Sequence, residues 1–250
     1  MTLIEAAVVI LAGVCAGIIN TVVGSGTLVT FPVLLWTGLP PVGASVANNI
    51  GGTLGSISGA IGYRKELSGT RRRLARVSVA AMLGGLTWAI LLVMLPPGVF
   101  RVVVPVLIAL ALGLVLAEPW LGRRLMAWRE SAPQQGSRSL IGAIFGASAY
   151  GGYFGAAQGV ILLAVMGLLT REPLQQINAL KNVVHAVGGS ASAVLFILIA
   201  QVDWASVLLL GSGAIIGGQI GARVGRRLPP AMLRAAIVVI GVVGIVQVVS

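Results

Sequence analysis

Residues 77–95 read VSVAAMLGGLTWAILLVML, a run of 19 residues without a charged side chain. Residues 204–222, WASVLLLGSGAIIGGQIGA, form a second run of the same length and character. A helix of about 20 apolar residues crosses a hydrocarbon core of about 30 Å. The two runs therefore predict membrane-spanning helices, and they indicate an all-α protein that is solvated mainly by lipid.

The composition of the whole chain agrees with these two runs. Of the 250 residues, 57% are hydrophobic and 9% are charged, and the mean hydropathy is +1.02. A soluble globular domain carries many more charges. The chain also has 35 glycines, and small residues let helices approach one another closely in lipid. We expect a tightly packed polytopic helical bundle. The N-terminus carries Glu5 and has no basic segment before its apolar stretch, so we expect the first helix to be retained and not cleaved as a signal peptide.

An internal repeat divides the chain into two halves. The match has three parts: Leu95-Pro96-Pro97 with Leu228-Pro229-Pro230, Gly84-Gly85 with Gly217-Gly218, and GSGTLVTFP from Gly24 with GAAQGVILL from Gly155. The first two pairs lie 133 positions apart and the third lies 131 apart. We therefore divide the chain into a first transmembrane repeat (1–121), a basic cytoplasmic linker (122–139) and a second transmembrane repeat (140–250).

Each repeat is predicted to contain one broken apolar segment and three complete spans. The broken segments are 3–37 and 140–169, interrupted where glycine and polar residues gather at 20–26 and 150–159. The expected spans are about 41–63, 74–95 and 99–120 in the first repeat, and about 174–200, 204–222 and 232–249 in the second.

The positions of the basic residues favour inverted repeats over parallel ones. If each broken segment enters the membrane and returns, 15 of the 17 Lys and Arg residues face the cytoplasm, as the positive-inside rule requires. If each segment crosses once, the repeats are parallel and the bases of 223–234 are exported. We expect inverted repeats, with the loops 64–76 and 223–234 in the cytoplasm and both termini outside it.

The two interruptions predict the position of a binding site. Inverted repeats with broken helices are typical of secondary transporters, which bind their substrate near the bilayer midplane. Non-helical backbone is tolerated at that depth only where protein or a wet cavity satisfies it, and a helix N-terminus there suits an anion. The candidate residues are Asn20, Gly24, Ser25, Gly26 and Thr27 at the first break, and Gly155, Gln158 and Gly159 at the second.

Lys181 is the one base predicted to lie inside a span, where an ammonium costs at least about 2.5 kcal/mol. In INALKNVVH (177–185), helical steps of three and four place Asn178, Lys181, Asn182 and His185 on one face. We expect this face to bind the anion, with His185 as the candidate for proton coupling. Alternatively, Lys181 lies near the helix end and extends its ammonium to the membrane–water interface, and the amides form hydrogen bonds between helices.

Neutral donors are expected to complete the site in the first half. Asn48 and Asn49 occupy the region that corresponds to Asn178, and amides can donate hydrogen bonds to an anion without adding charge. The hydroxyls of Thr53, Ser56 and Ser58 follow on the same predicted span. They are weaker candidates because such side chains also bond between helices.

Other function classes find little support in the residues. The carboxylates lie at span ends or in loops, and the sequence offers no nucleophile–base pair, metal-ligand cluster or phosphate-binding motif. We therefore expect no enzyme activity, no metal site and no cofactor. The net charge of +11 is scattered between apolar runs, so no nucleic-acid partner is expected.

The order and spacing of several segments resemble the sulfite exporter TauE/SafE family, also called the toluene-sulfonate uptake permease family. The resemblance covers nearly the whole chain and is carried by AGIINTVVGSGTLVTFPVLLWTGLPPVGASVANNIGG (16–52), YGGYFGAAQGVILL (150–163), INALKNVV (177–184), VDW (202–204) and IGGQIGARVGRRLPPAMLR (216–234). It implies multi-pass transport of sulfite, a sulfonate or a related anion across the bacterial inner membrane. The first half has no counterpart of Lys181, so the two half-sites differ in chemistry.

Two other functions stay open at this point, a passive anion channel and a membrane scaffold or sensor that transports nothing. A channel needs a continuous wet path and weak sites, whereas a carrier binds and saturates. The expected partners are the lipid bilayer and a small anionic substrate. The sequence leaves open which anion is carried, in which direction, with which ion, and whether the chain forms a homo-oligomer.

Overall fold

The computed structural model describes residues 1–67, 71–94, 97–131, 137–170 and 172–224, and these ranges contain helices and no strand. The helices of the first half are α1 (Leu3–Val22), α2 (Thr27–Trp36), α3 (Pro41–Gly62), the short 3-10 helix η1 (Arg64–Leu67), α4 (Arg71–Met94) and α5 (Pro97–Ser131). Those of the second half are α6 (Ser137–Tyr153), α7 (Gln158–Leu169), α8 (Leu174–Ile199) and α9 (Trp204–Val224). The predicted span 232–249 and most of the loop 223–234 lie outside the described residues.

Both predicted breaks are present, and they have the same local structure. Gly24 follows α1 with φ +89°, and Gly155 follows α6 with φ +76°. The Gly24 N–H donates to the carbonyl of Ile19 (2.9 Å), and the Gly155 N–H donates to that of Tyr150 (3.4 Å). Glycine adopts positive φ without a Cβ clash, so one glycine in each half ends a helix at the position that the sequence match indicates.

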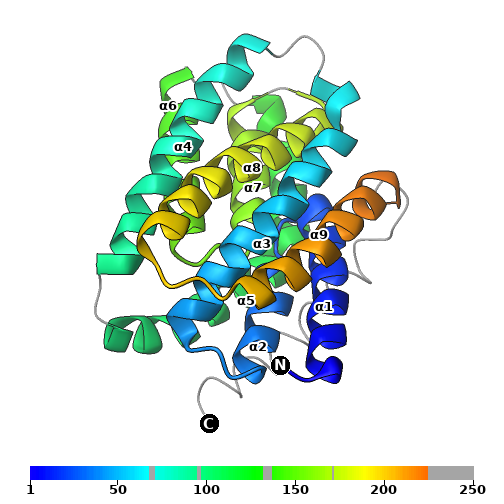
Figure 1. The fold of residues 1–250 in the computed structure, drawn as a ribbon. Coiled ribbons are helices and arrows are strands. Elements are labelled where there is room, and N and C mark those ends of the chain that lie inside the picture. Colours follow the sequence, from blue (N-terminus) through cyan, green and yellow to red (C-terminus); the bar gives the residue numbers. More distant parts are fainter. Residues whose placement is uncertain (68–70, 95–96, 132–136, 171, 225–250) are drawn as a thin grey trace.

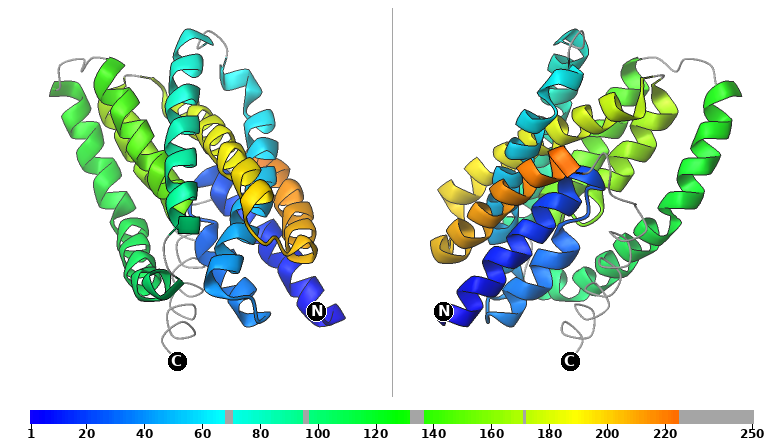
Figure 2. Two further views of the ribbon diagram at one scale, coloured as in Figure 1. Left: turned by 60° about the vertical axis from the view of Figure 1, so that its left-hand side comes forward. Right: turned by 90° about the vertical axis from the view of Figure 1, so that its right-hand side faces the viewer.

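The two halves also pack on each other in matched ways. α9 lies along α1, and α4 lies along α6 (Figures 1 and 2). A Cβ added to Gly217 would lie 2.1 Å from the carbonyl oxygen of Val14, and one added to Gly84 would lie 2.4 Å from that of Phe145. These distances leave no room for a side chain. The repeated glycines therefore serve equivalent contacts between the halves.

The broken segments enter the bundle from opposite ends. We call the end that holds residue 1 and the α8–α9 connection the N-terminal end, and the other, which holds η1 and the start of α6, the opposite end. α1 runs inward from the N-terminal end, and α6 runs inward from the opposite end (Figure 2). α3 and α8 traverse the centre between them (Figure 1).

The outer surface is apolar. Leu116, Leu198 and Leu208 are each at least 60% exposed, as expected of side chains that contact lipid. In the described part of the chain, four helices are long and apolar enough to cross a membrane, namely Leu3–Val22, Arg73–Met94, Leu174–Ile199 and Trp204–Arg223. The prediction of a polytopic helical membrane protein is confirmed.

α3 has the predicted bounds but is less apolar than the four helices above, and α5 is longer than predicted. α3 is absent from those four because glycine, serine and asparagine occupy much of it, and these residues face the interior. α5 continues to Ser131, beyond the predicted span end at 120 and into the basic stretch assigned to the linker. Hydropathy predicts where a helix leaves lipid, but helix-forming residues such as those of 121–130 can extend it further.

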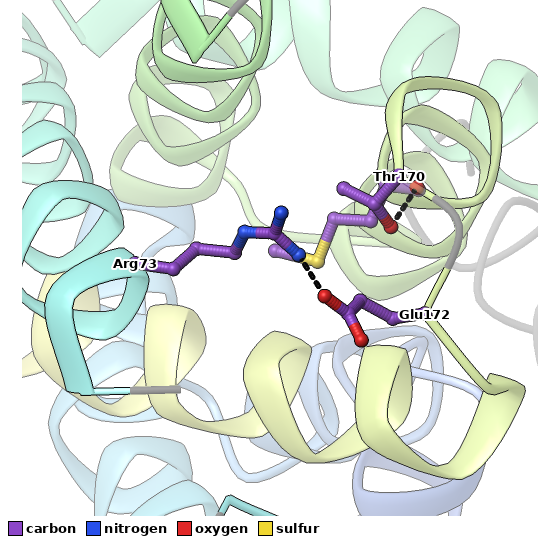
Figure 3. Close-up of polar contacts among 4 residues, drawn as sticks. Arg73, Thr170 and Glu172 are labelled. Carbon is purple, nitrogen blue, oxygen red and sulfur yellow. Dashed lines mark hydrogen bonds and ion pairs between the residues drawn. The ribbon is translucent and has the colours of Figure 1, made fainter. Parts of the chain in front are cut away.

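An ion pair joins the two halves at the opposite end of the bundle. Arg73, near the start of α4, pairs with Glu172 in the segment between α7 and α8 (Figure 3). The two side chains are 40% and 29% exposed, so solvent screens the pair. Next to it, the Thr170 hydroxyl donates to the Met166 carbonyl (2.7 Å) and ends α7 (Figure 3).

Candidate functional site

A small cavity lies in the middle of the bundle, beside the second break. Its volume is about 30 Å³, room for a few atoms. The lining residues come from α2, α3, α6, α7, α8 and the second break: Thr27, Ser45, Asn48, Asn49, Gly52, Thr53, Ser56, Ser148, Gly151, Gly152, Phe154, Gly155, Gln158, His185, Gly188 and Gly189. Among these residues there is no Lys, Arg, Asp or Glu, and His185 is the one with a titratable side chain.

Asn48 fixes the α2 side of the cavity. Its Nδ2 donates to the Thr27 hydroxyl (3.2 Å), and its Oδ1 accepts a hydrogen bond from the Thr30 hydroxyl. Both threonines belong to α2, the half-helix that follows the first break. The Asn48 amide therefore ties α3 to α2 and holds the first turn of α2 against the cavity.

Three lining side chains carry buried polar atoms without a hydrogen-bond partner in the described part of the protein. They are Asn49 Oδ1, Ser148 Oγ and His185 Nδ1. Native proteins rarely leave such atoms unsatisfied, and an unmade hydrogen bond costs about 1–3 kcal/mol. Rotation of the Asn49 amide puts an N–H group in place of its oxygen, the Ser148 hydroxyl donates its own proton, and His185 Nδ1 donates in the tautomer that is protonated there. These three lining residues thus have hydrogen-bonding capacity that the described part of the protein leaves unused.

The N-termini of two half-helices also meet the cavity. Thr27 is the first residue of α2 and Gln158 the first residue of α7, and both line it. The first three N–H groups of α7 already donate to the carbonyls of Gly155, Gly24 and Ala157, so the two helix ends act through their dipoles, each about half a positive charge. Gln158 is 3% exposed, and its amide lies over Gly151, where an added Cβ would meet it at 2.2 Å. The arrangement is electropositive without a fixed cation.

The two breaks touch each other next to the cavity. The Gly159 N–H donates to the Gly24 carbonyl across the halves (2.9 Å). A Cβ added to Gly24 would lie 2.2 Å from Gly159 Cα. Only two glycines permit this approach, so the first turn of α7 rests directly on the end of α1.

Lys181 and Asn182 do not line the cavity. Lys181 is fully buried, and its Nζ donates to the carbonyls of Asn20 (2.9 Å) and Thr21 (3.1 Å), at the end of α1. Asn182 Nδ2 donates to the same Thr21 carbonyl (3.2 Å). Asn20 connects them to the site, because its Nδ2 donates to Ser56 Oγ (3.3 Å), which lines the cavity.

The predicted site residues thus separate into two groups. The cavity brings together Thr27, Asn48, Asn49, Gly155, Gln158 and His185. The residues that lie outside its lining are Asn20, Gly24, Ser25, Gly26, Gly159, Asn178, Lys181 and Asn182. In the second group Ser25 Oγ and Asn178 Oδ1 are buried and have no hydrogen-bond partner within the described ranges, so these two side chains also have unused hydrogen-bonding capacity.

Several lining residues were missed by the sequence reasoning, above all Ser45, Ser148, Gly151 and Gly152. A usable signal existed for Ser148, which precedes Gly151 and Gly152 by three and four positions on the helix that leads into the second break. Gly188 and Gly189 continue the polar face of Lys181 and His185 by the same spacing. The glycines make room for the cavity, and the serine puts a hydroxyl into it.

The comparisons with known proteins bear on this site. The family model described as sulfite exporter TauE/SafE matches residues 9–248. The chain belongs to the TauE/SafE family. A probable membrane transporter protein of Haemophilus influenzae is 27% identical over 93% of this chain and 90% of its own length. No solved structure matches the chain significantly.

Two further relatives carry similar names. The probable membrane transporter protein YfcA of Escherichia coli K12 is 27% identical, covering 91% of this chain and 83% of its own length. The probable membrane transporter protein ORF9 of a Sinorhizobium species is 26% identical, covering 92% and 87%. The match extends over both breaks and the cavity, so this TauE/SafE chain is a multi-pass membrane protein of a transporter family.

Proposed function

We propose that this chain is a secondary transporter that carries a small sulfur-containing anion across the bacterial inner membrane and binds it in the central cavity. The observation that carries the proposal is that Asn49, Ser148 and His185 all line this cavity and each have a buried polar atom without a hydrogen-bond partner among the described residues. Two helix N-termini reach the same space. An anion that leaves water must exchange its hydration shell for such donors.

The size and charge of the cavity narrow the choice of substrate. A volume of about 30 Å³ is nearer to an oxyanion of a few atoms, such as sulfite, than to a sulfonate with a carbon chain. Neutral donors and helix dipoles suit a single negative charge. His185 lines the cavity and is the group that could gain a proton together with the anion, so we propose proton coupling through His185. The proposal leaves no chemical step for an enzyme.

Binding to the purified protein tests the proposal. A thermal-shift series with sulfite, sulfate, thiosulfate, sulfoacetate and taurine should show stabilisation by the smallest oxyanions, since a ligand at 100 times its Kd adds about 2.7 kcal/mol. Ser148→Ala should reduce the shift by at least about half, because a tenfold weaker affinity leaves about 1.4 kcal/mol at the same concentration. Ser212→Ala, which removes an exposed hydroxyl bonded only to the Leu209 carbonyl among described residues, should keep it. Equal shifts in both variants, or none in the wild type, would contradict the assignment.

A further inference from the structure

The first break leaves the end of α1 with backbone carbonyls that its own helix cannot satisfy. The carbonyl of Ile19 accepts the N–H groups of Val23 (2.7 Å) and Gly24 (2.9 Å). The next two carbonyls, of Asn20 and Thr21, accept hydrogen bonds only from side chains of α8 in the described residues. The end of α1 is therefore capped by the other half of the protein.

Lys181 suits this position electrostatically. The last turn of a helix carries partial negative charge, which a cation stabilises. Its Nζ makes two hydrogen bonds there, and the side chain has no exposed surface. A buried ammonium is tolerated where such partners replace water. The Lys181 ammonium therefore binds the end of α1 and does not lie in the lining of the cavity.

The second break is capped in a different way. Ser45 Oγ, from α3, donates to the Tyr153 carbonyl (3.3 Å), and the Tyr150 hydroxyl donates to the Ala156 carbonyl (2.7 Å). In both breaks the long central helix of the other half supplies a cap. Among the residues that the structure describes, only the cap of the first break includes a cation, and charge-assisted hydrogen bonds are stronger than neutral ones.

One path connects Lys181 to the cavity. Lys181 Nζ holds the Asn20 carbonyl, and the Asn20 side chain donates to Ser56 Oγ, which donates in turn to the Gly52 carbonyl (3.2 Å). Ser56 and Gly52 both line the cavity. A change at Lys181 can thus reach the site through Asn20 without any contact between Lys181 and the bound anion.

We propose that Lys181, helped by Asn182, is a positioning residue that fixes the end of α1 and, through the Asn20 side chain, holds Ser56 in place in the cavity lining. This inference rests on the proposed function and changes the role predicted for Lys181 from the sequence. A direct ligand would act on the anion by itself. A positioning residue acts only as long as Asn20 is present to transmit its effect.

A double-mutant cycle on anion affinity separates these roles. Lys181→Met and Asn20→Ala should each weaken binding of the best oxyanion about tenfold, the size of one lost hydrogen bond. The double variant should bind no more than about twofold more weakly than either single one. Losses that multiply to about a hundredfold, or wild-type affinity in Lys181→Met, would overturn the proposal.

A second variant and a ligand-free measurement cover the case in which Lys181→Met fails to fold. Asn182→Ala removes the other donor to the Thr21 carbonyl and keeps the charge of Lys181. It should weaken anion binding less than Lys181→Met does, and it should have this effect only when the Asn20 side chain is present. In hydrogen–deuterium exchange without any anion, either variant should speed exchange of the amides of 23–27 by about tenfold and leave those of 154–158 unchanged. Unchanged exchange at 23–27 would refute the cap, whether or not an anion binds. A lack of anion binding to the wild type would instead refute the proposed function.

Discussion

Alanine at Gly24 would test whether the contact between the two breaks stabilises the fold. Gly24 has φ +89°, a conformation that costs an L-residue about 1–2 kcal/mol. A Cβ there would also lie 2.2 Å from Gly159 Cα, so backbone has to shift, and overpacking of this kind costs about 1–3 kcal/mol. The two contributions predict a loss of about 2–5 kcal/mol in the free energy of unfolding.

The chain provides a matched control for this substitution. Gly38 has φ +87°, but a Cβ added there would meet no atom within 4 Å. Gly38→Ala therefore carries the backbone strain alone, about 1–2 kcal/mol. The assay is unfolding of the purified variants in one detergent, with anion binding as a second readout. If Gly24→Ala is no less stable than Gly38→Ala, the breaks do not touch as described.

Three further predictions concern the ends of the bundle and proton coupling. Glu172→Gln should change the free energy of unfolding by less than about 1 kcal/mol, because the Arg73–Glu172 pair is partly exposed; denaturant titration checks this, and a larger loss would contradict the screening argument. If the repeats are inverted, a cysteine at Lys65 should resist an impermeant reagent added to intact cells, and one at Gln201 should react; the reverse pattern or equal labelling would exclude that topology. His185→Gln should keep anion binding but make uptake into liposomes insensitive to a proton gradient, so uptake that still follows the gradient would remove His185 from the coupling role.

Much of the architecture was accessible from the sequence because the features that determine it are local. Gly24 and Gly155 stand in matched nine-residue segments, and it is this match, together with the polar residues around each glycine, that indicates a helix end. The glycine pairs at 84 and 217 were found by comparing the halves, and they make equivalent contacts. How the halves pack on each other was not accessible, since it depends on contacts between distant segments.

The candidate site was only partly predictable for the same reason. The polar face of α8 from Asn178 to Gly189 is about 16 Å long, at 1.5 Å per residue, and meets more than one neighbour. Helical spacing places Lys181 and His185 on one face, but it cannot tell that Lys181 meets α1 while His185 meets the cavity. Ser148 was missed because its signal is its helical spacing to Gly151 and Gly152, which lie in the second break, and not a charge or an amide of its own.

Gradient-driven uptake by proteoliposomes tests the central claim, that a carrier site for a small oxyanion lies in the cavity. The measurement is the initial rate of sulfite uptake against concentration for the wild type, Ser148→Ala and Ser212→Ala. We predict saturable uptake by the wild type and by Ser212→Ala, and at least about a tenfold loss of the ratio of maximal rate to half-saturation concentration in Ser148→Ala, the size expected for one hydrogen bond to an anion. Uptake that rises linearly without saturation would identify a channel, and equal rates in the two serine variants would place the substrate elsewhere.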